Sequence, residues 1–232
     1  MERKEDVKEG AIKYLVKLLL QRIIGVALFF IAAGTFYNVR GIVNLTLYLA
    51  VSVIACIMMF SGHQETLNER GKKQENTKGW DKMLLPIIWL LVYFLIYLVA
   101  GLGVRFEWNS LSIEWFYIGT IIYLISSVFT VWPVLENKHF ESTSRIQNNR
   151  EQTVITTGPY RIVRHPGYAG LVLWAIATAL MFGMLAVGVV SLIIISTICV
   201  RTYLEDKMLK EELKGYLEYS QKVRYRLFPF IW

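Results

Sequence analysis

A short stretch in the C-terminal half of the chain combines residue types that can form a polar binding site. Residues 156–170 read TTGPYRIVRHPGYAG and hold two arginines, two tyrosines and a histidine among glycines and prolines. Pro166 suits the first position of a helix, because that position has no use for the N–H that proline lacks. The free N–H groups and the dipole at a helix start attract carboxylates and other acceptors. The stretch therefore predicts a ligand site where a loop enters an apolar helix; a simple turn is the alternative.

Arg201 and Glu205 form a second pair with possible chemistry. They are four residues apart in a segment with helical spacing, so their side chains share one face of the predicted helix. From the pattern alone, the simplest interpretation is an exposed ion pair worth a few tenths of a kcal/mol.

Together these regions resemble the isoprenylcysteine carboxyl methyltransferase family and its prokaryotic members, which are membrane enzymes that use S-adenosylmethionine. The resemblance covers roughly residues 136–229, and a looser one extends to residues 69–70 and 80–82. The matching pieces are residues 156–160, residues 164–170, Arg201 with Glu205, and Tyr216 and Tyr219 before Val223-Arg224.

The resemblance implies a methyltransferase that uses S-adenosylmethionine and acts on a lipid-like or amphiphilic acceptor, such as a prenylated cysteine carboxylate. It implies that Arg201 binds the acceptor and that Arg164 belongs to the catalytic group, with no metal ion at the site. Gln152 stands where some relatives have a histidine. The implied cofactor residues are Gln152, Thr153, Val154, Ile155, Tyr160, His165, Pro166, Gly167, Tyr168 and Glu205.

Methyl transfer to a carboxylate suits this set of side chains. A carboxylate is already ionised near neutral pH, so it needs no general base, whereas an amine acceptor would have to lose a proton. Alignment of the two reactants and exclusion of water can then supply much of the rate. The alternatives are a sterol-type membrane reductase that uses NADPH, and a structural or transport protein without enzymatic activity.

The elements that must position these residues are apolar helices. The chain is 55% hydrophobic with a mean hydropathy of +0.42, which predicts an all-α integral membrane protein with five or six transmembrane helices. The lipid bilayer is thus an expected partner. In the first span Lys13, Lys17 and Arg22 are expected to reach the membrane surface. The predicted spans are residues 11–37, 41–61, 83–104 and 115–135, with a polar loop at 62–82.

Residues 166–200 are apolar throughout, which is too long for one ordinary crossing. We expect a helical hairpin of residues 167–182 and 184–200 that turns at Gly183; one tilted or broken helix is the alternative. An interfacial helix at 201–213 continues the last span. The chain then divides into membrane helices at 1–135 and a catalytic region at 136–232, within one structural domain.

The basic residues give an orientation. The net charge of +7 could indicate nucleic acid in a soluble chain, but here the basic residues lie between apolar runs, so membrane topology explains them and no nucleic acid is expected. All lysines and arginines except Arg40 and Arg105 fall on one side of the predicted bundle. The positive-inside rule makes that side cytoplasmic, so both termini and the site are expected on the cytoplasmic face of a prokaryotic cell membrane. The sequence leaves the oligomeric state open.

Overall fold

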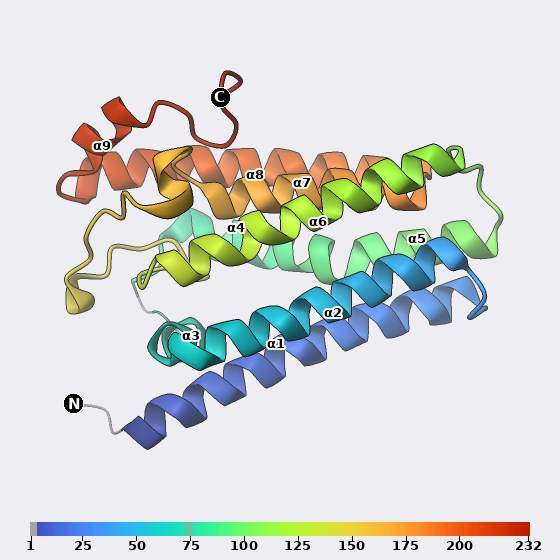
Figure 1. Ribbon diagram of the computed structural model, residues 1–232, viewed down its shortest axis with the longest axis horizontal. Helices are drawn as coiled ribbons and strands as arrows, with labels where there is room; N and C mark the ends of the chain where they lie inside the picture. The colour runs from blue at the N-terminus through green and yellow to red at the C-terminus, as the bar shows by residue number, and fades with distance from the viewer. Residues whose placement is uncertain (1–3, 73, 75) are drawn as a thin grey trace.

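The computed structural model describes residues 4–72, 74 and 76–232 as an elongated bundle whose helices run back and forth along one long axis (Figure 1). Apart from one isolated β-bridge between Ser110 and Met184, the regular elements in these residues are all helical. In chain order they are α1 (Lys4–Ala33), α2 (Val39–Gly62), α3 (Gln64–Gly71), α4 (Gly79–Leu90), the π-helical η1 (Leu91–Leu95), α5 (Ile96–Arg105), α6 (Ile113–Glu136), the 3-10 turns η2 (Asn148–Arg150) and η3 (Gly158–Arg161), α7 (Pro166–Phe182), α8 (Leu185–Glu212) and α9 (Tyr216–Lys222).

Among the described residues, five helices are long and apolar enough to cross a membrane, which confirms the all-α integral membrane class. They are Lys4–Ala33, Val39–Gly62, Gly79–Arg105, Ile113–Glu136 and Leu185–Glu212. The sixth apolar helix, α7, has 17 residues and is therefore about 25 Å long, slightly less than the roughly 30 Å of a hydrocarbon core.

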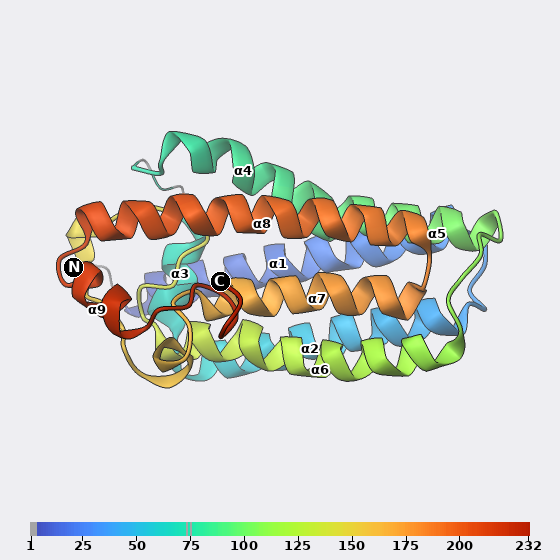
Figure 2. The ribbon, with the colours of Figure 1, turned by 90° about the horizontal axis from the view of Figure 1, so that it is seen from above.

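The predicted hairpin is confirmed, because α7 and α8 are separate antiparallel helices (Figure 2). Gly183 ends α7 with φ 71° in the left-handed region, which glycine adopts without penalty. A Cβ at this position would lie 2.6 Å from Nη1 of Arg40 and 2.9 Å from the amide nitrogen of Leu111. The hairpin turn therefore needs glycine for both its conformation and its packing.

Two segments differ from the sequence prediction. The polar segment at 62–82 is not a plain loop, because it contains α3, whose face carrying Thr66, Leu67 and Asn68 is buried. The helix expected at 201–213 forms the last turns of the unbroken α8 (Figure 2). Arg3 and Lys73, which belong to the charge count above, lie outside the described residues.

Small residues let α6 and α7 approach each other closely. A Cβ on Gly170 of α7 would lie 2.7 Å from a backbone carbon of α6, and one on Gly119 of α6 would lie 2.9 Å from the carbonyl oxygen of Ala177. Ala169 and Ala175 on α7 are also buried. The short first arm of the hairpin is thus packed tightly against α6, which holds the polar loop between these helices at one end of the bundle.

Arg22 on α1 does not extend to the membrane surface as predicted. Its guanidinium lies 4.7 Å from the ring centroid of Tyr48 and 5.6 Å from that of Tyr93, both on neighbouring elements. Lys17, by contrast, is exposed and lies 5.9 Å from the ring of Trp89. Hydropathy could not separate these two cases, because the direction in which a side chain points depends on how the helix is packed.

We predict that Gly183→Ala lowers the free energy of unfolding by more than about 1 kcal/mol, because alanine is strained at positive φ and its Cβ would contact Leu111. The measurement is thermal unfolding in detergent. Gly188→Ala is the matched control: a Cβ there meets no atom within 4 Å, and alanine favours the helix. Equal melting temperatures for the two variants would contradict the prediction.

Candidate functional site

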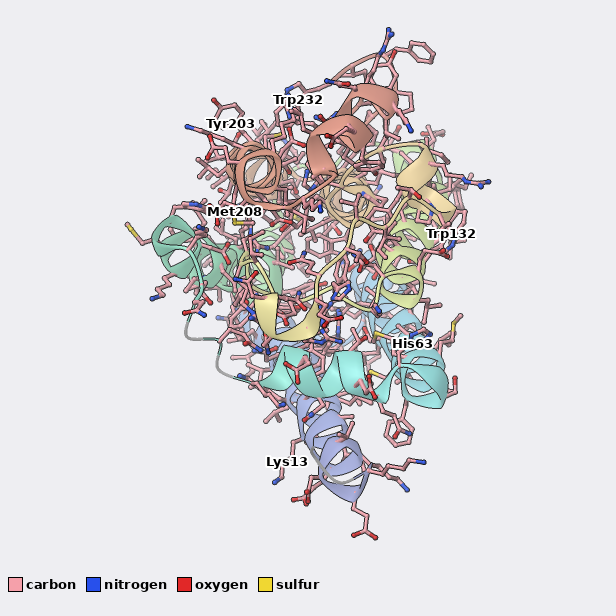
Figure 3. The ribbon with its side chains drawn as sticks, turned by 90° about the vertical axis from the view of Figure 1, so that its left-hand side faces the viewer. Lys13, His63, Trp132, Tyr203, Met208 and Trp232 are labelled. Atoms are coloured by element: carbon pink, nitrogen blue, oxygen red, sulfur yellow. The ribbon has the colours of Figure 1, made fainter. Side chains whose placement is uncertain are left out.

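A cavity of about 340 Å³ begins at the end of the bundle where α3, α9 and the start of α1 lie, and continues inward between the helices. Figure 3 looks onto this end, where the segment between α6 and α7 crosses the helix ends. All of the residues that the resemblance assigned to the site line this one cavity. They are Gln152, Thr153, Val154, Ile155, Tyr160, Arg164, His165, Pro166, Gly167, Tyr168, Arg201 and Glu205.

Arg201 is held by a carboxylate from a distant part of the chain. Its Nε donates to Oδ1 of Asp81 at 2.7 Å, and its Nη2 donates to Oδ2 of Asp81 at 3.2 Å and to the carbonyl oxygen of Ser142 at 2.7 Å. Both side chains are buried, so this pair is not the exposed Arg201–Glu205 ion pair of the simplest sequence interpretation. The Nη1 group of Arg201 makes no hydrogen bond within the described part of the protein, and it is the edge left for a ligand.

Glu205 faces the cavity one turn further along α8. Its Oε2 accepts hydrogen bonds from the hydroxyl of Tyr168 at 2.7 Å and from Ser144 Oγ at 2.5 Å. Its Oε1 accepts no hydrogen bond from the described residues, and the side chain is 21% exposed. The imidazole of His165 stacks on the ring of Tyr168 at 5.8 Å with an 8° angle between the planes. One open carboxylate oxygen and two stacked rings therefore form a wall of the cavity.

Asp206, next to Glu205, lies behind this wall, 3.4 Å from Nε2 of His165, and joins three segments. It accepts two hydrogen bonds from Arg164, at 2.7 and 3.0 Å, one from Tyr216 at 3.0 Å and one from Arg226 at 3.0 Å. Nη1 of Arg164 also donates to the backbone carbonyls of Val223 and Arg224 at 2.8 and 2.7 Å. Arg164 thus ties α8 and the C-terminal tail to the loop that precedes α7.

The charges and burial in this network shift the pKa values of its members. Burial would lower the pKa of Arg164, but its hydrogen bonds and charge contact with Asp206 outweigh burial and raise it. Burial, and then the negative charge of Asp206, raise the pKa of Tyr216 far above its ordinary value. Tyr216 therefore stays protonated and can donate to Asp206 throughout the physiological pH range.

The segment between α6 and α7 is ordered by side-chain contacts with its own backbone. Oε1 of Gln152 accepts from the amide of Gln147 at 2.8 Å, and the side chain of Gln147 donates to the carbonyl of His139 at 2.7 Å. The hydroxyl of Tyr219 donates to the carbonyl of Tyr160 at 2.7 Å. Burial, together with nearby Arg150 and Lys138, lowers the pKa of His139, so its imidazole is neutral near pH 7 on the cavity wall.

Three polar residues of the site did not stand out in the sequence. Asp81 lies within residues 80–82, which loosely resemble the family. This resemblance was the signal in the sequence that could have identified Asp81. Ser144 has no distinguishing pattern. Asp206 directly follows Glu205, but adjacent helical residues point in different directions, and the structure sends one to the cavity and the other to Arg164.

The fold and this site define an all-α integral membrane protein with a polar cavity at one end of its helical bundle. Residues 118–211 match the family described as isoprenylcysteine carboxyl methyltransferase (ICMT). This match shows that part of the chain is similar to that family.

The chain is also similar to curated proteins, and it spans less than two thirds of the length of each. The chain is 33% identical over 122 residues to the probable protein-S-isoprenylcysteine O-methyltransferases of Oryza sativa subsp. indica and subsp. japonica. These residues make up 50% of this chain and 63% of each rice protein. Identity to protein-S-isoprenylcysteine O-methyltransferase B of Arabidopsis thaliana is 25% over 92 residues, which cover 39% of this chain and 47% of that protein.

We predict that Asp206→Asn destabilises the protein by about 3 kcal/mol, because it leaves the buried Arg164 without a counter-ion. The measurement is the melting temperature in detergent. Glu211→Gln on the same helix is the control, since Glu211 is exposed and its ion pair with Lys207 is worth at most a few tenths of a kcal/mol. A melting temperature for Asp206→Asn equal to that of the control would show that the network is unimportant for stability.

Proposed function

We propose that this protein is an S-adenosylmethionine-dependent methyltransferase that methylates a carboxylate on a lipid-like acceptor. One observation carries the proposal: a single cavity brings the open edge of Arg201 together with the open oxygen of Glu205 and continues from there between apolar helices. A lipid-borne substrate can thus keep its tail among the helices while its head group reaches the polar end. The names of the rice and Arabidopsis relatives support the same reaction class.

The residues of the proposed cofactor site fit the methyl donor by their chemistry. S-adenosylmethionine carries ribose hydroxyls and a positive charge, which suit the unpaired Oε1 of Glu205 and the π faces of Tyr168 and His165. Residues 152–155 line the same cavity. When bound, S-adenosylmethionine would supply the methyl group from its sulfonium centre, and the neutral thioether would be the leaving group.

Arg201 is proposed to bind the acceptor carboxylate through Nη1. Its pairing with Asp81 fixes the plane of the guanidinium, so that the remaining edge is already oriented when a carboxylate arrives. The carboxylate attacks without loss of a proton, and the protein contributes alignment and exclusion of water. Ser144 and Tyr168 hold Glu205 in place. They thereby fix the position of the cofactor part of the site relative to the acceptor part.

Arg164 is proposed to be a positioning residue. Its Nε, Nη1 and Nη2 groups all donate to Asp206 or to tail carbonyls, so the guanidinium is engaged within the protein. It acts on the reaction by holding the loop that carries His165 against α8. Arg164, which the resemblance assigned to the catalytic group, would then contribute to catalysis indirectly.

The active end is proposed to face the cytoplasm. The start of α1, α3 and α9 lie at the same end of the bundle as the cavity mouth, and the loop between α5 and α6 lies at the other end (Figure 1). Arg40 and Arg105, which carry the basic charge assigned to the far side, flank the helix ends near that loop.

For this orientation we expect an epitope tag inserted after Gln74 to be cytoplasmic and one inserted after Trp108 to lie on the opposite side, because of the asymmetry of basic residues. The measurement is tag accessibility in intact and permeabilised cells. Tags accessible from the same side, or with the sides reversed, would contradict the proposed orientation.

The roles of Arg201 and Glu205 predict different kinetic defects. Lysine cannot reproduce the planar fork of arginine, so Arg201→Lys should keep S-adenosylmethionine affinity but lower methyl transfer about 100-fold. Glu205→Gln should weaken S-adenosylmethionine binding about tenfold, because a charged acceptor is lost. Calorimetric titration measures binding, and transfer of a radiolabelled methyl group to an S-farnesylcysteine derivative measures turnover.

Glu212→Gln, an exposed position on the same helix, serves as the control and should match wild type in both assays. Titration with NADPH tests the reductase alternative, and binding of NADPH but not S-adenosylmethionine would overturn the proposed function. If Arg201→Lys and Glu205→Gln left turnover intact and changed only the melting temperature, the assigned roles would be wrong.

A further inference from the structure

The inner end of the cavity contains an unpaired cation. Arg22 of α1 lines this end together with Tyr48 of α2 and Tyr93 of η1, all outside the family-matched residues 118–211. Its guanidinium contacts the two tyrosine rings and forms no ion pair with any described carboxylate. The Nε of Arg22 and the hydroxyl of Tyr48 are buried and have no hydrogen-bond partner in the described part of the chain. Two groups that can donate hydrogen bonds are thus left without a partner among the described residues.

This arrangement is costly unless an anion completes it. Cation–π contacts contribute less than the removal of an ion from water costs. Ionisable side chains inside membrane spans are rare and mark functional sites. The tyrosine rings keep Arg22 in the cavity but leave its positive charge without compensation, so an anionic oxygen group is the chemistry that fits.

The backbone around Arg22 is shaped to hold it inside the bundle. Gly25, one turn further along α1, lets α1 approach η1, since a Cβ there would lie 2.5 Å from the carbonyl oxygen of Tyr93. Tyr93 itself lies in the π-helical segment Leu91–Leu95, and such segments are frequent at functional sites. Tyr48 is supported from behind by Tyr97, with ring centroids 5.1 Å apart. Two independent backbone features therefore place the aromatic rings around this cation.

The cavity is long enough to join this cation to the proposed catalytic end. On α6 both Tyr123 and Val134 line it, and their separation along the helix is about 16 Å at 1.5 Å per residue. A long-chain molecule can therefore place one end at Arg201 and the other near Arg22.

We propose that Arg22, with the Tyr48 hydroxyl, binds a second anionic oxygen group at the tail end of the acceptor. The preferred ligands are then long-chain amphiphiles that carry an acid group at each end, rather than acids with a plain hydrocarbon tail. This inference rests on the proposed function for the reacting end of the acceptor. It adds that the inner end of the cavity selects the acceptor by the group at its tail end.

The test uses purified protein in detergent without S-adenosylmethionine. Dodecanedioic acid, dodecanoic acid and the ω-hydroxy acid of the same length are titrated calorimetrically, and a longer diacid checks the chain length. Wild type should bind one of the diacids about tenfold more tightly than the monoacid, with the ω-hydroxy acid close to the monoacid, because a charge-assisted hydrogen bond is worth about 1.5–3 kcal/mol. Equal binding of diacids and monoacid, or a hydroxy acid as tight as the diacid, would overturn the proposal.

Substitutions at single positions test which residues cause the preference for the diacid. Arg22→Met should remove the preference for the diacid, whereas Lys17→Met, which removes an exposed cation one turn earlier on α1, should keep it. Tyr48→Phe retains the ring beneath Arg22 but lacks the hydroxyl, so it should reduce the preference several-fold even if Arg22→Met does not fold. A diacid preference that persists in the folded Arg22→Met or Tyr48→Phe protein would contradict the inference.

These measurements separate the two proposals. Methyl transfer without any diacid preference would overturn the role of Arg22 and leave the proposed function standing. A diacid preference that Arg22→Met removes, in a protein that neither binds S-adenosylmethionine nor transfers a methyl group, would support the anion site and overturn the methyltransferase assignment.

Discussion

Charged side chains buried at one end of a membrane bundle must find partners, and this requirement organises the candidate site of the protein. Arg201 pairs with Asp81, and Arg164 pairs with Asp206. Each pair joins segments that are far apart in the chain, because loss of hydration inside the bundle is tolerated only when hydrogen bonds and an opposite charge replace it. The buried ion pairs thus determine which loops meet at the end of the bundle.

The adjacent positions Glu205 and Asp206 show how one helix serves structure and ligand binding together. Asp206 is saturated by Arg164, Tyr216 and Arg226, and it anchors the tail. Glu205 keeps one oxygen open toward the cavity. A side chain whose hydrogen bonds are all used inside the protein can only position others, whereas one with an open atom can contact a ligand. This difference underlies the proposed division of roles between Arg164 and Arg201 as well.

The cavity combines two polar ends with an apolar passage. At its mouth the charged groups are paired and each leaves one atom open, while at its inner end Arg22 contacts aromatic rings and has no counter-ion among the described residues. The mouth lies largely within the family-matched region, and the inner end is built mainly by α1, α2 and η1 outside it. The proposed reaction site and the proposed anion site are therefore built by different parts of the chain.

The sequence by itself determined the membrane class, the apolar spans, the turn at Gly183 and, through the resemblance, a set of residues that prove to line one cavity. These features depend on local hydropathy, on the special conformation of glycine and on a contiguous motif, so neighbouring residues are enough to reveal them. The tertiary structure alone decided that Arg201 binds Asp81, 120 positions away in sequence, and that Arg22 turns into the bundle. The choice of an ion-pair partner and the direction of a side chain depend on which helix faces pack together. The hydropathy of a single segment does not determine that packing.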